Sequence, residues 1–399
     1  MNTFTHPNPD NQSMDRTEIR PIVTRRDLDQ FIAFPFQLYK GNRYWCPPLK
    51  SDEFRTLSKE KNPAFEFCEA AYWMAYQNGV PVGRIAGIIN HREAEIWQAK
   101  LVRFGWFDFI DDPAVSKALI TAVTEWGRSK GMTGIHGPLG FNDMDPEGML
   151  IEGFEELSGM AAIYNYPYYP SHMNLLGFQK AADWIQLEIQ VPLRIPEKIE
   201  RMSRIVLAKY PLHLLKVGSS KALHPYAMKM FRMYNETFRH LYGFVPLSEQ
   251  QIAFYTNQYF SFINPDFVSL ALDDRDEVVG FGVTMPSLSR ALRRANGSLF
   301  PFGFLHLLKA LKVNDTVHMY LVGVHPDYQE KGVLALIYHE LTKTYIEKGI
   351  RIARTHALLE HNSRVVSIWK NYVGRVNIRR RCWVKEIENG KWKMENGKR

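Results

Sequence analysis

The sequence predicts a mixed α/β protein made of two similar halves, and two recurring features support this prediction. The first is a strand–turn–strand pattern that contains Gly83 in the first half and Gly280 in the second. The second is a late glycine, Gly177 or Gly374, followed by a β-rich run. The glycines of each pair are 197 positions apart (280 − 83 and 374 − 177). Since self-similarity at a fixed offset is the sequence signature of repetition, we expect a duplicated fold with mixed sheets.

The composition fits two globular domains. The chain has 399 residues, of which 45% are hydrophobic and 23% charged, and domains usually contain about 100–200 residues. Pro192 and Pro196 punctuate the middle of the chain, where we place the boundary. We therefore expect a flexible tail over 1–17, one domain over 18–195 and a second over 196–399.

The composition also limits the cellular location of the protein and the kinds of ligand it can bind. No apolar run approaches the ~18 residues that cross a bilayer, and the N-terminus has no apolar signal core. The three cysteines are far apart and form no disulfide framework or metal pair. We therefore expect a cytoplasmic protein without a metal site. A net charge of +8 favours an anionic ligand such as a phosphorylated cofactor, a membrane surface or nucleic acid. The charge is scattered, so we do not expect nucleic acid.

Between the hairpin and the late glycine, each half has a strand and then an amphipathic helix. This helix ends at a glycine, which is the common C-terminal stop of helices. These glycines, Gly131 and Gly349, are 218 positions apart (349 − 131), which is 21 more than 197. The second half therefore has extra residues before its helix, which we place within 286–311. The first half has extra residues after its helix, within 137–159.

The segment from Val317 to Ile346 predicts a buried strand, a tight polar loop and a helix. The first turn of a helix has unpaired N–H groups, and the helix dipole favours negative charge there. Gly332, at the helix entrance, allows close approach of a ligand to the backbone, and Lys331 adds a positive charge. The segment thus predicts a pyrophosphate-binding loop.

This segment resembles the signature of the GNAT superfamily of acyl-CoA-dependent N-acyltransferases, which is a strand, then Gln/Arg-x-x-Gly-x-Gly/Ala, then a helix. The chain has Leu334 at the last position of that motif. The resemblance implies a tandem duplication of the GNAT fold, with acetyl-CoA or another acyl-CoA as co-substrate. Strand backbone would pair with pantetheine, and the loop would hold the pyrophosphate. The implied contacts are Val322, Gly323, Val324, Gln329, Glu330, Lys331, Gly332, Val333 and Leu334.

A second family element follows a predicted strand over 350–359. The next residues resemble the Asn-x-x-Ala-x-x-x-Tyr helix of the superfamily, and Asn362 matches its asparagine. Asparagine is also a common helix N-cap, and both roles can hold together. Trp369 stands where the family usually has a tyrosine that protonates the departing thiolate. Either Tyr372 replaces this tyrosine, or a water molecule protonates the thiolate.

The transfer of an acyl group to an amine requires a base, a stabilised oxyanion and a protonated leaving group. The resemblance places the oxyanion near the backbone N–H of Val324. Two residues near the end of the strand over 350–359 are candidate bases. They are His356, which can also be a core histidine, and Glu360, which can also be a solvated carboxylate.

Polar residues in the extra segment of the first half can bind the acceptor at the junction of the domains. We single out Asn142, Asp143 and Glu147 as contacts for the cationic amine of a small molecule or peptide. The same residues also suit an ordinary polar loop.

The first half lacks the phosphate loop. Asp111 and Asp112 stand at its helix start, where they satisfy the dipole themselves and would repel pyrophosphate. We therefore expect acyl-CoA to bind the second half.

Two readings compete with an acyl-CoA N-acyltransferase that transfers an acetyl group to a primary amine. Leu334 and Trp369 favour a non-catalytic ligand-binding protein on a decayed acyltransferase scaffold. Aminoacyl transfer from tRNA suits the basic charge, but the phosphate loop argues against it. The apolar stretch 299–308 can pack within its own half, cover a long acyl chain or touch a membrane.

Overall fold

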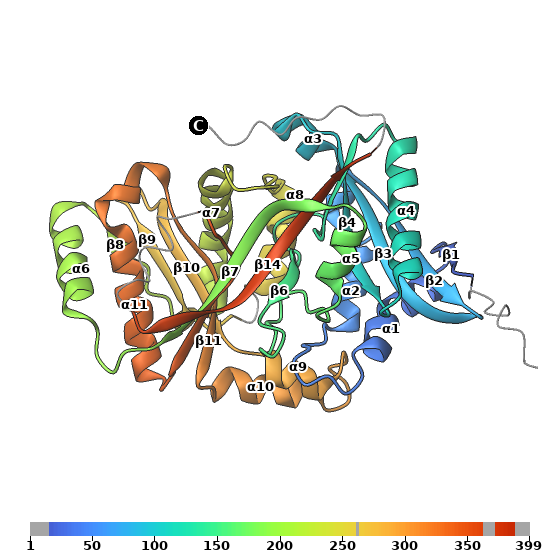
Figure 1. Cartoon of the computed structure of the whole chain (residues 1–399). Helices are drawn as coiled ribbons and strands as arrows, with labels where there is room; N and C mark the ends of the chain where they lie inside the picture. Colours follow the sequence, from blue (N-terminus) through green and yellow to red (C-terminus); the bar gives the residue numbers. More distant parts are fainter. Residues whose placement is uncertain (1–15, 261–262, 362–371, 388–399) are drawn as a thin grey trace, which may run out of the picture.

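The computed structural model describes residues 16–260, 263–361 and 372–387 (Figure 1). Asn362 and Trp369, two of the predicted cofactor contacts, lie outside these residues. The described part forms a mixed sheet of fourteen strands with helices packed on it. None of the helices found in these three ranges is long and apolar enough to cross a membrane.

The first half contains the N-terminal strands and most of their covering helices. Its elements are β1 (Glu18–Pro21), α1 (Arg25–Leu38), α2 (Lys50–Leu57), η1 (Pro63–Glu66), β2 (Cys68–Gln77), β3 (Val80–Asn90), α3 (His91–Trp97), β4 (Leu101–Phe109), α4 (Pro113–Ser129), β5 (Gly134–Gly137), β6 (Met149–Glu152), α5 (Tyr169–Leu175) and β7 (Gln179–Gln190).

The second half has the same order of strands, but five of the described α-helices precede its strand β11, whereas three precede β4 in the first half. Its elements are α6 (Glu197–Lys209), β8 (His213–Leu214), α7 (Ser220–Phe238), α8 (Glu249–Tyr259), η2 (Pro265–Phe267), β9 (Val268–Leu272), β10 (Val278–Pro286), α9 (Ser289–Ala295), α10 (Gly303–Lys312), β11 (Thr316–Val324), η3 (Pro326–Lys331), α11 (Val333–Glu347), β12 (Ile352–Thr355), β13 (Leu358–Leu359) and β14 (Gly374–Glu386).

The repeated hairpin glycines have a packing reason. A Cβ atom at Gly83 would lie 2.8 Å from Leu119 of α4, and one at Gly280 would lie 2.8 Å from Val333 of α11. Such distances are too short for any side chain, so in both halves the helix lies directly on the glycine of the hairpin. The duplication inferred from spacing therefore reflects one helix–sheet contact made twice.

The structure refines three predicted segments. The strand expected over 350–359 is broken: β12 ends at Thr355, and β13 pairs with β7 instead of β11. The extra residues of the second half form α9 and α10, as their position between β10 and β11 requires. The extra residues of the first half form β6 and the loop that precedes it.

The two halves exchange their last strands. The order across the sheet is β1-β2-β3-β4-β5-β14-β7-β12-β11-β10-β9-β8. Thus β7, from the first half, pairs with β12 of the second, and β14, from the second half, pairs with β5 of the first. The exchanged strands also pair antiparallel with each other and cross the middle of the molecule (Figure 1). The sheet is therefore continuous from one half to the other.

Candidate functional site

The strands β11 and β12 run parallel for only part of their length. Their pairing covers Thr316–Met319 of β11 and Ile352–Thr355 of β12, and β11 then continues to Val324. No strand of the described chain pairs with this edge of β11 beyond Met319. The Val324 carbonyl accepts from the Gln329 side-chain amide at 3.4 Å, and the other backbone groups of Val322, Gly323 and Val324 that face this edge can pair with a ligand, as the resemblance implied.

A β-bulge in β11 lies where the two strands part. On the other side of β11, Leu321 pairs with Val283 and Met319 pairs with Thr284, so Tyr320 has no partner residue in β10. Bulges re-aim side chains and are over-represented beside active sites. Sequence reasoning missed Tyr320, because a bulge leaves no mark in hydrophobic periodicity.

The predicted phosphate loop has the expected geometry. Val324 is followed by the short helix η3, and Gly332 then adopts the left-handed conformation, with φ of 81°, at the start of α11. A Cβ atom at Gly332 would lie 2.9 Å from Val206 of α6, so glycine is required by both backbone and packing. Leu334, which departs from the family motif, packs against the core formed by α11 and its sheet.

Two lysines gather beside this loop. The ammonium group of Lys331 lies 4.4 Å from the ring centroid of Tyr328 and 5.5 Å from that of Tyr210. Lys209, at the end of α6, lies 5.4 Å from the same Tyr210 ring. Gln329 and Glu330 are exposed on the loop. The loop and the end of α6 therefore place two positive charges near the N-terminus of α11, a position that suits an anion.

A small cavity of about 100 Å³ lies beside the opening between β11 and β12. Both halves contribute to its wall. The lining residues are Asp143, Met144, Met160, Ala161, Phe231, Tyr259, Phe260, Ile263, Val283, Met285, Tyr320, Leu321 and His356. A mostly apolar cavity with a few convergent polar groups is the usual form of a small-molecule site.

Besides Tyr259, three polar side chains line this cavity. The Tyr320 hydroxyl is buried and has no hydrogen-bond partner within the described residues. Burial raises the pKa of this phenol, so it stays protonated. His356 begins the turn after β12, its N–H donates to the carbonyl of Met319 at 2.8 Å, and its ring centroid lies 6.1 Å from that of Tyr320. Burial, and then the charge of Arg380, lower the pKa of His356 to about 4. The predicted candidate is thus a neutral and weak base.

Asp143, a predicted acceptor contact, is the third group. Burial raises the pKa of its carboxyl group, and the charges of Glu93 and Asp145 raise it further. A carboxyl group whose pKa is moved toward neutrality is suited to accept and release protons.

The other two acceptor residues lie on the same segment. The Asn142 amide donates to the Tyr255 hydroxyl of α8 at 2.9 Å, so it links the two halves. Burial and the charge of Asp143 raise the pKa of Glu147. Neither Asn142 nor Glu147 lines the cavity itself.

Buried Arg103 of β4 fixes this acidic segment against the second half. Its guanidinium donates to Glu93 at 2.7 Å, to the carbonyl of Gly140 at 3.0 Å and to the carbonyl of Gly243 at 2.7 Å. The first of these contacts lies in the first half, and the last lies beyond α7 in the second. Arg103 therefore joins the two halves beside the acidic segment.

The remaining predicted residues lie away from the cavity. Glu360 forms ion pairs with Arg379 and with Lys180, and the hydrogen bond from Arg379 lowers its pKa. A carboxylate held in this way is a poor base. Tyr372 packs against Ile185, Leu187 and Ile189 on β7. No group of three His, Cys, Asp or Glu side chains in the described ranges is arranged to hold a metal ion.

The matching gap in the first half is closed by the chain itself. β4 and β5 pair only through Leu101–Arg103, but the N–H of Leu139 then donates to the carbonyl of Phe104 at 2.8 Å. The N–H of Phe109 donates to the Tyr169 hydroxyl at 2.9 Å, and the Tyr168 hydroxyl donates to the carbonyl of Phe109. The backbone edge that could meet pantetheine is thus occupied at both ends.

The predicted acidic helix start closes the rest of this gap. Asp112 is the N-cap of α4 and accepts from the N–H of Ala114 at 2.7 Å. Asp111 forms an ion-pair contact of 2.9 Å with His172 of α5, which also bonds to Ser116. This side of the first half therefore presents carboxylates where the second half presents lysines.

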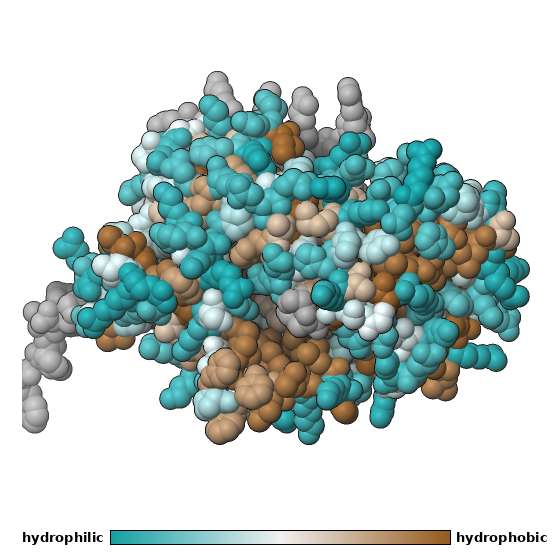
Figure 2. Space-filling view, turned by 180° about the vertical axis from the view of Figure 1, so that it is seen from behind, coloured by the Kyte–Doolittle hydropathy of each residue, from teal (hydrophilic) through white to brown (hydrophobic). Residues whose placement is uncertain are grey.

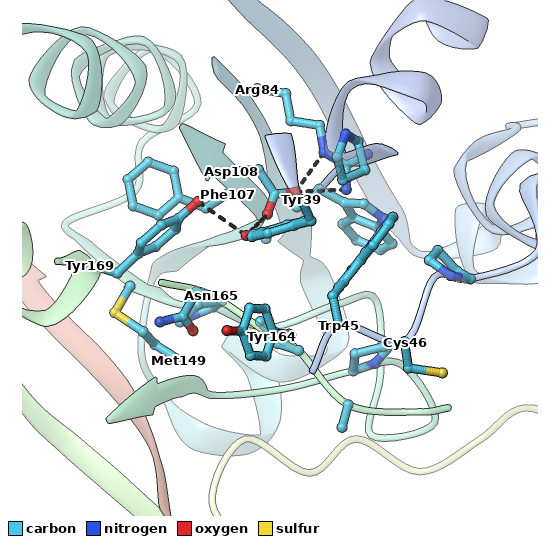
Figure 3. Close-up of a pocket in the computed structure, with 18 of the residues that line it drawn as sticks. Tyr39, Trp45, Cys46, Arg84, Phe107, Asp108, Met149, Tyr164, Asn165 and Tyr169 are labelled. Atoms are coloured by element: carbon cyan, nitrogen blue, oxygen red, sulfur yellow. Dashed lines mark hydrogen bonds and ion pairs between the residues drawn. The ribbon is translucent and has the colours of Figure 1, made fainter. Parts of the chain in front are cut away.

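A cavity of about 100 Å³ remains inside the first half (Figure 3). On its wall, the Asp108 carboxylate accepts from Arg84 at 2.8 Å and from the Tyr39 hydroxyl at 2.8 Å. The Tyr39 hydroxyl lies 3.2 Å from that of Tyr169, and Tyr164 also lines the space. The aromatic run over 164–170 thus walls a cavity in which the polar groups named here are already paired.

Two curated proteins are similar to this chain in sequence. Protein YghO of Escherichia coli (strain K12) is 30% identical over 380 residues, which cover 92% of this chain and 95% of that protein. The bacterial ceramide synthase of Caulobacter vibrioides (strain NA1000 / CB15N) is 26% identical over 312 residues, covering 77% and 80%. No sequence profile of a known protein family matches the chain.

Solved structures share the fold. A tandem GNAT protein from the clavulanic acid biosynthesis pathway superposes with a TM-score of 0.55 at 12% identity, covering 94% of this chain and 100% of that chain. The predicted fold class, a tandem duplication of the GNAT fold, is therefore confirmed.

Proposed function

Because this chain belongs to the GNAT superfamily, in the same family as protein YghO, we propose that it transfers an acyl group from acyl-CoA to an amine. The observation that carries the proposal is the open edge of β11, which leads from the bulge at Tyr320 directly into the phosphate loop before α11. One end of this path suits a thioester, and the other suits a pyrophosphate.

We place acyl-CoA on the second half. The pantetheine arm pairs with the backbone of Val322, Gly323 and Val324, where it displaces the Gln329 amide from the Val324 carbonyl, and the pyrophosphate lies against the N–H groups at the start of α11. Lys331 and Lys209 supply the positive charge there. The packing of Leu334 against the core supports this placement, because its side chain is held away from the ligand.

The acyl carbon then lies at the bulge, beside the cavity. The amine nitrogen attacks the thioester carbonyl, so a C–N bond forms and the C–S bond breaks. Asp143 takes the proton that the nitrogen loses, and the Tyr320 hydroxyl protonates the thiolate. A proton passed from Asp143 to Tyr320 restores both groups. In this assignment, Tyr320 takes the role that the sequence suggested for Tyr372.

The chemistry of the cavity favours an apolar acyl group or acceptor. Phe231, Ile263 and Met285 are among its lining residues, and Asp143 is the one carboxylate on its described wall. A relative of this chain is named a ceramide synthase, and a ceramide is an amide of a long-chain amino alcohol. We therefore extend the proposal from acetyl transfer to fatty acyl transfer, with an amphiphilic amine as acceptor.

Two measurements test this function. Calorimetry with acetyl-CoA and with a long-chain acyl-CoA should detect binding below millimolar concentration. Release of coenzyme A should then depend on an added amine, and should be faster with a long-chain amino alcohol than with propylamine. Absence of binding would rule out the transfer reaction. Binding without turnover across the amines would instead favour a ligand-binding protein on the same scaffold.

A further inference from the structure

The hairpin formed by α9 and α10 exposes an apolar face that the proposed reaction does not use. Phe300 is 77% exposed, Phe302 69%, and Leu305 and Leu308 are each 50% exposed. Seen from behind, this face is a continuous hydrophobic area at the lower edge of the molecule (Figure 2). Contiguous exposed patches of this kind mark interaction sites on otherwise soluble surfaces.

Helix α10 is apolar on two sides. Its inner residues, Leu307 and Leu311, pack with Met285 and Leu292 in a small core. Its outer residues, such as Leu305 and Leu308, face solvent. A surface helix normally has a polar outer side. The apolar outer side of α10 therefore calls for an apolar partner.

The charges on the segment that carries this face are almost all positive. The segment from Pro286 to Thr316 carries five basic residues and one acidic residue, Asp315. The basic residues are Arg290, Arg293, Arg294, Lys309 and Lys312. They are exposed, as α9 buries only its opposite side. An apolar helix face bordered by basic residues is the pattern of a helix that lies in a membrane interface.

We propose that the α9–α10 face docks on the surface of a bilayer that contains anionic lipids. Association of two copies through this face would bring like charges together, so charge favours a membrane over a second copy. The small core beneath α10 includes Met160, Met285 and Tyr320, which also line the cavity beside the β11 bulge. Docking would therefore hold that cavity close to the hydrocarbon region of the membrane.

Flotation with lipid vesicles tests this proposal on the full chain and without substrate, so the result does not depend on the transfer reaction. The wild type should float with vesicles of equal amounts of phosphatidylcholine and phosphatidylglycerol, and much less with phosphatidylcholine alone. The double variant Leu305→Asp/Leu308→Asp should lose at least about tenfold in bound fraction. The double variant Arg293→Glu/Arg294→Glu should lose the preference for phosphatidylglycerol.

The matched control is Val80→Asp, which changes an exposed apolar residue at the tip of the β2–β3 hairpin in the other half. It should bind vesicles like the wild type. Amide hydrogen exchange should slow over 299–312 when vesicles are added, which localises the contact and does not rely on any variant. Absence of wild-type flotation, or equal flotation of the leucine variant, would overturn the proposal. So would a wild-type dimer that the leucine variant breaks, because that result assigns the face to a second copy.

Discussion

The gaps beside β4 and β11 have the same strand arrangement, but the gap beside β4 is filled by side chains and the gap beside β11 is open. In both, a parallel pair separates after a few residues, and the longer strand contains a bulge: at Trp106 and Phe107 in β4, and at Tyr320 in β11. Tyr168 and Tyr169 then bind both backbone groups of Phe109 at the end of β4, whereas at the end of β11 the side-chain amide of Gln329 donates to the Val324 carbonyl at 3.4 Å and no tyrosine of the described chain takes the matching place. A duplicated binding groove can thus become core by acquiring a few aromatic side chains, with the strand geometry retained.

The filled gap and the open gap should differ in their contribution to the free energy of folding. A buried backbone group without a partner costs about 1–3 kcal/mol, and the tyrosines remove that cost for Phe109 in the first half. The second half leaves the edge of β11 to water or to a ligand. The sealed gap therefore contributes to stability and the open one to binding, so variants in the two places should change different quantities.

The largest effect should come from Asp143→Asn. If Asp143 accepts the amine proton, its loss should lower kcat at least about 100-fold and leave the affinity for acyl-CoA unchanged. The wild-type rate should fall as pH drops through the raised pKa of this carboxyl, because only the carboxylate accepts a proton. That part of the pH profile should be absent in the variant. Asp111→Asn, at the matching helix start of the sealed half, should leave the rate unchanged.

The second effect concerns the sealed gap itself. Tyr169→Phe removes the acceptor of the Phe109 N–H and a partner of Tyr39, so the free energy of unfolding should fall by about 1–3 kcal/mol. Urea denaturation measures this loss, and acyl-CoA affinity should not change. Tyr328→Phe, which alters an exposed loop of the other half, serves as the control. Wild-type stability in Tyr169→Phe would mean that water replaces the tyrosine and that the gap is not sealed.

A smaller effect is expected at the phosphate loop. Lys331→Glu should weaken the binding of coenzyme A by roughly tenfold, because it reverses a charge next to the pyrophosphate. The control is Lys117→Glu, which changes an exposed lysine in the second turn of α4. Calorimetry should show no change for that control. Equal losses in the two variants would indicate only a general charge effect, and unchanged affinity in Lys331→Glu would show that the loop is misplaced.

The smallest effect should follow Leu334→Ala, which restores the family motif. Since the Leu334 side chain packs against the core, the affinity for coenzyme A should change by less than about threefold. The free energy of unfolding should fall by about 1 kcal/mol. A large gain in affinity would instead mean that Leu334 obstructs the pyrophosphate.

Local patterns made much of the second half predictable. The strand over 317–324, the loop with Gly332 and the helix after it follow from periodicity and from the needs of a left-handed glycine. The repeated glycines could be aligned because each lies under a helix. The sequence places Asp111 and Asp112 at a helix start, and Asp112 is the N-cap. All of these features depend on residues close in sequence or on a repeated spacing.

Features that depend on distant pairing were not predictable from one sequence. Tyr320 matters because β10 skips it, and Tyr168 and Tyr169 matter because they reach Phe109, about 60 positions earlier (169 − 109). The apolar stretch over 299–308 shows the same limit. Its composition allowed packing, chain covering or membrane contact, and only the exposure of Phe300 and its neighbours favours the last.

The exchange of β7 and β14 has a consequence for the order in which the protein is made. β5 needs β14 as its neighbour, yet β14 ends at Glu386 and is synthesised after nearly all other described elements. The N-terminal half therefore emerges from the ribosome with an unfilled place in the middle of its sheet, and its edge must be protected until the last strand arrives. Each half completes the other only after β14 has been synthesised, so the two folds mature together rather than in turn.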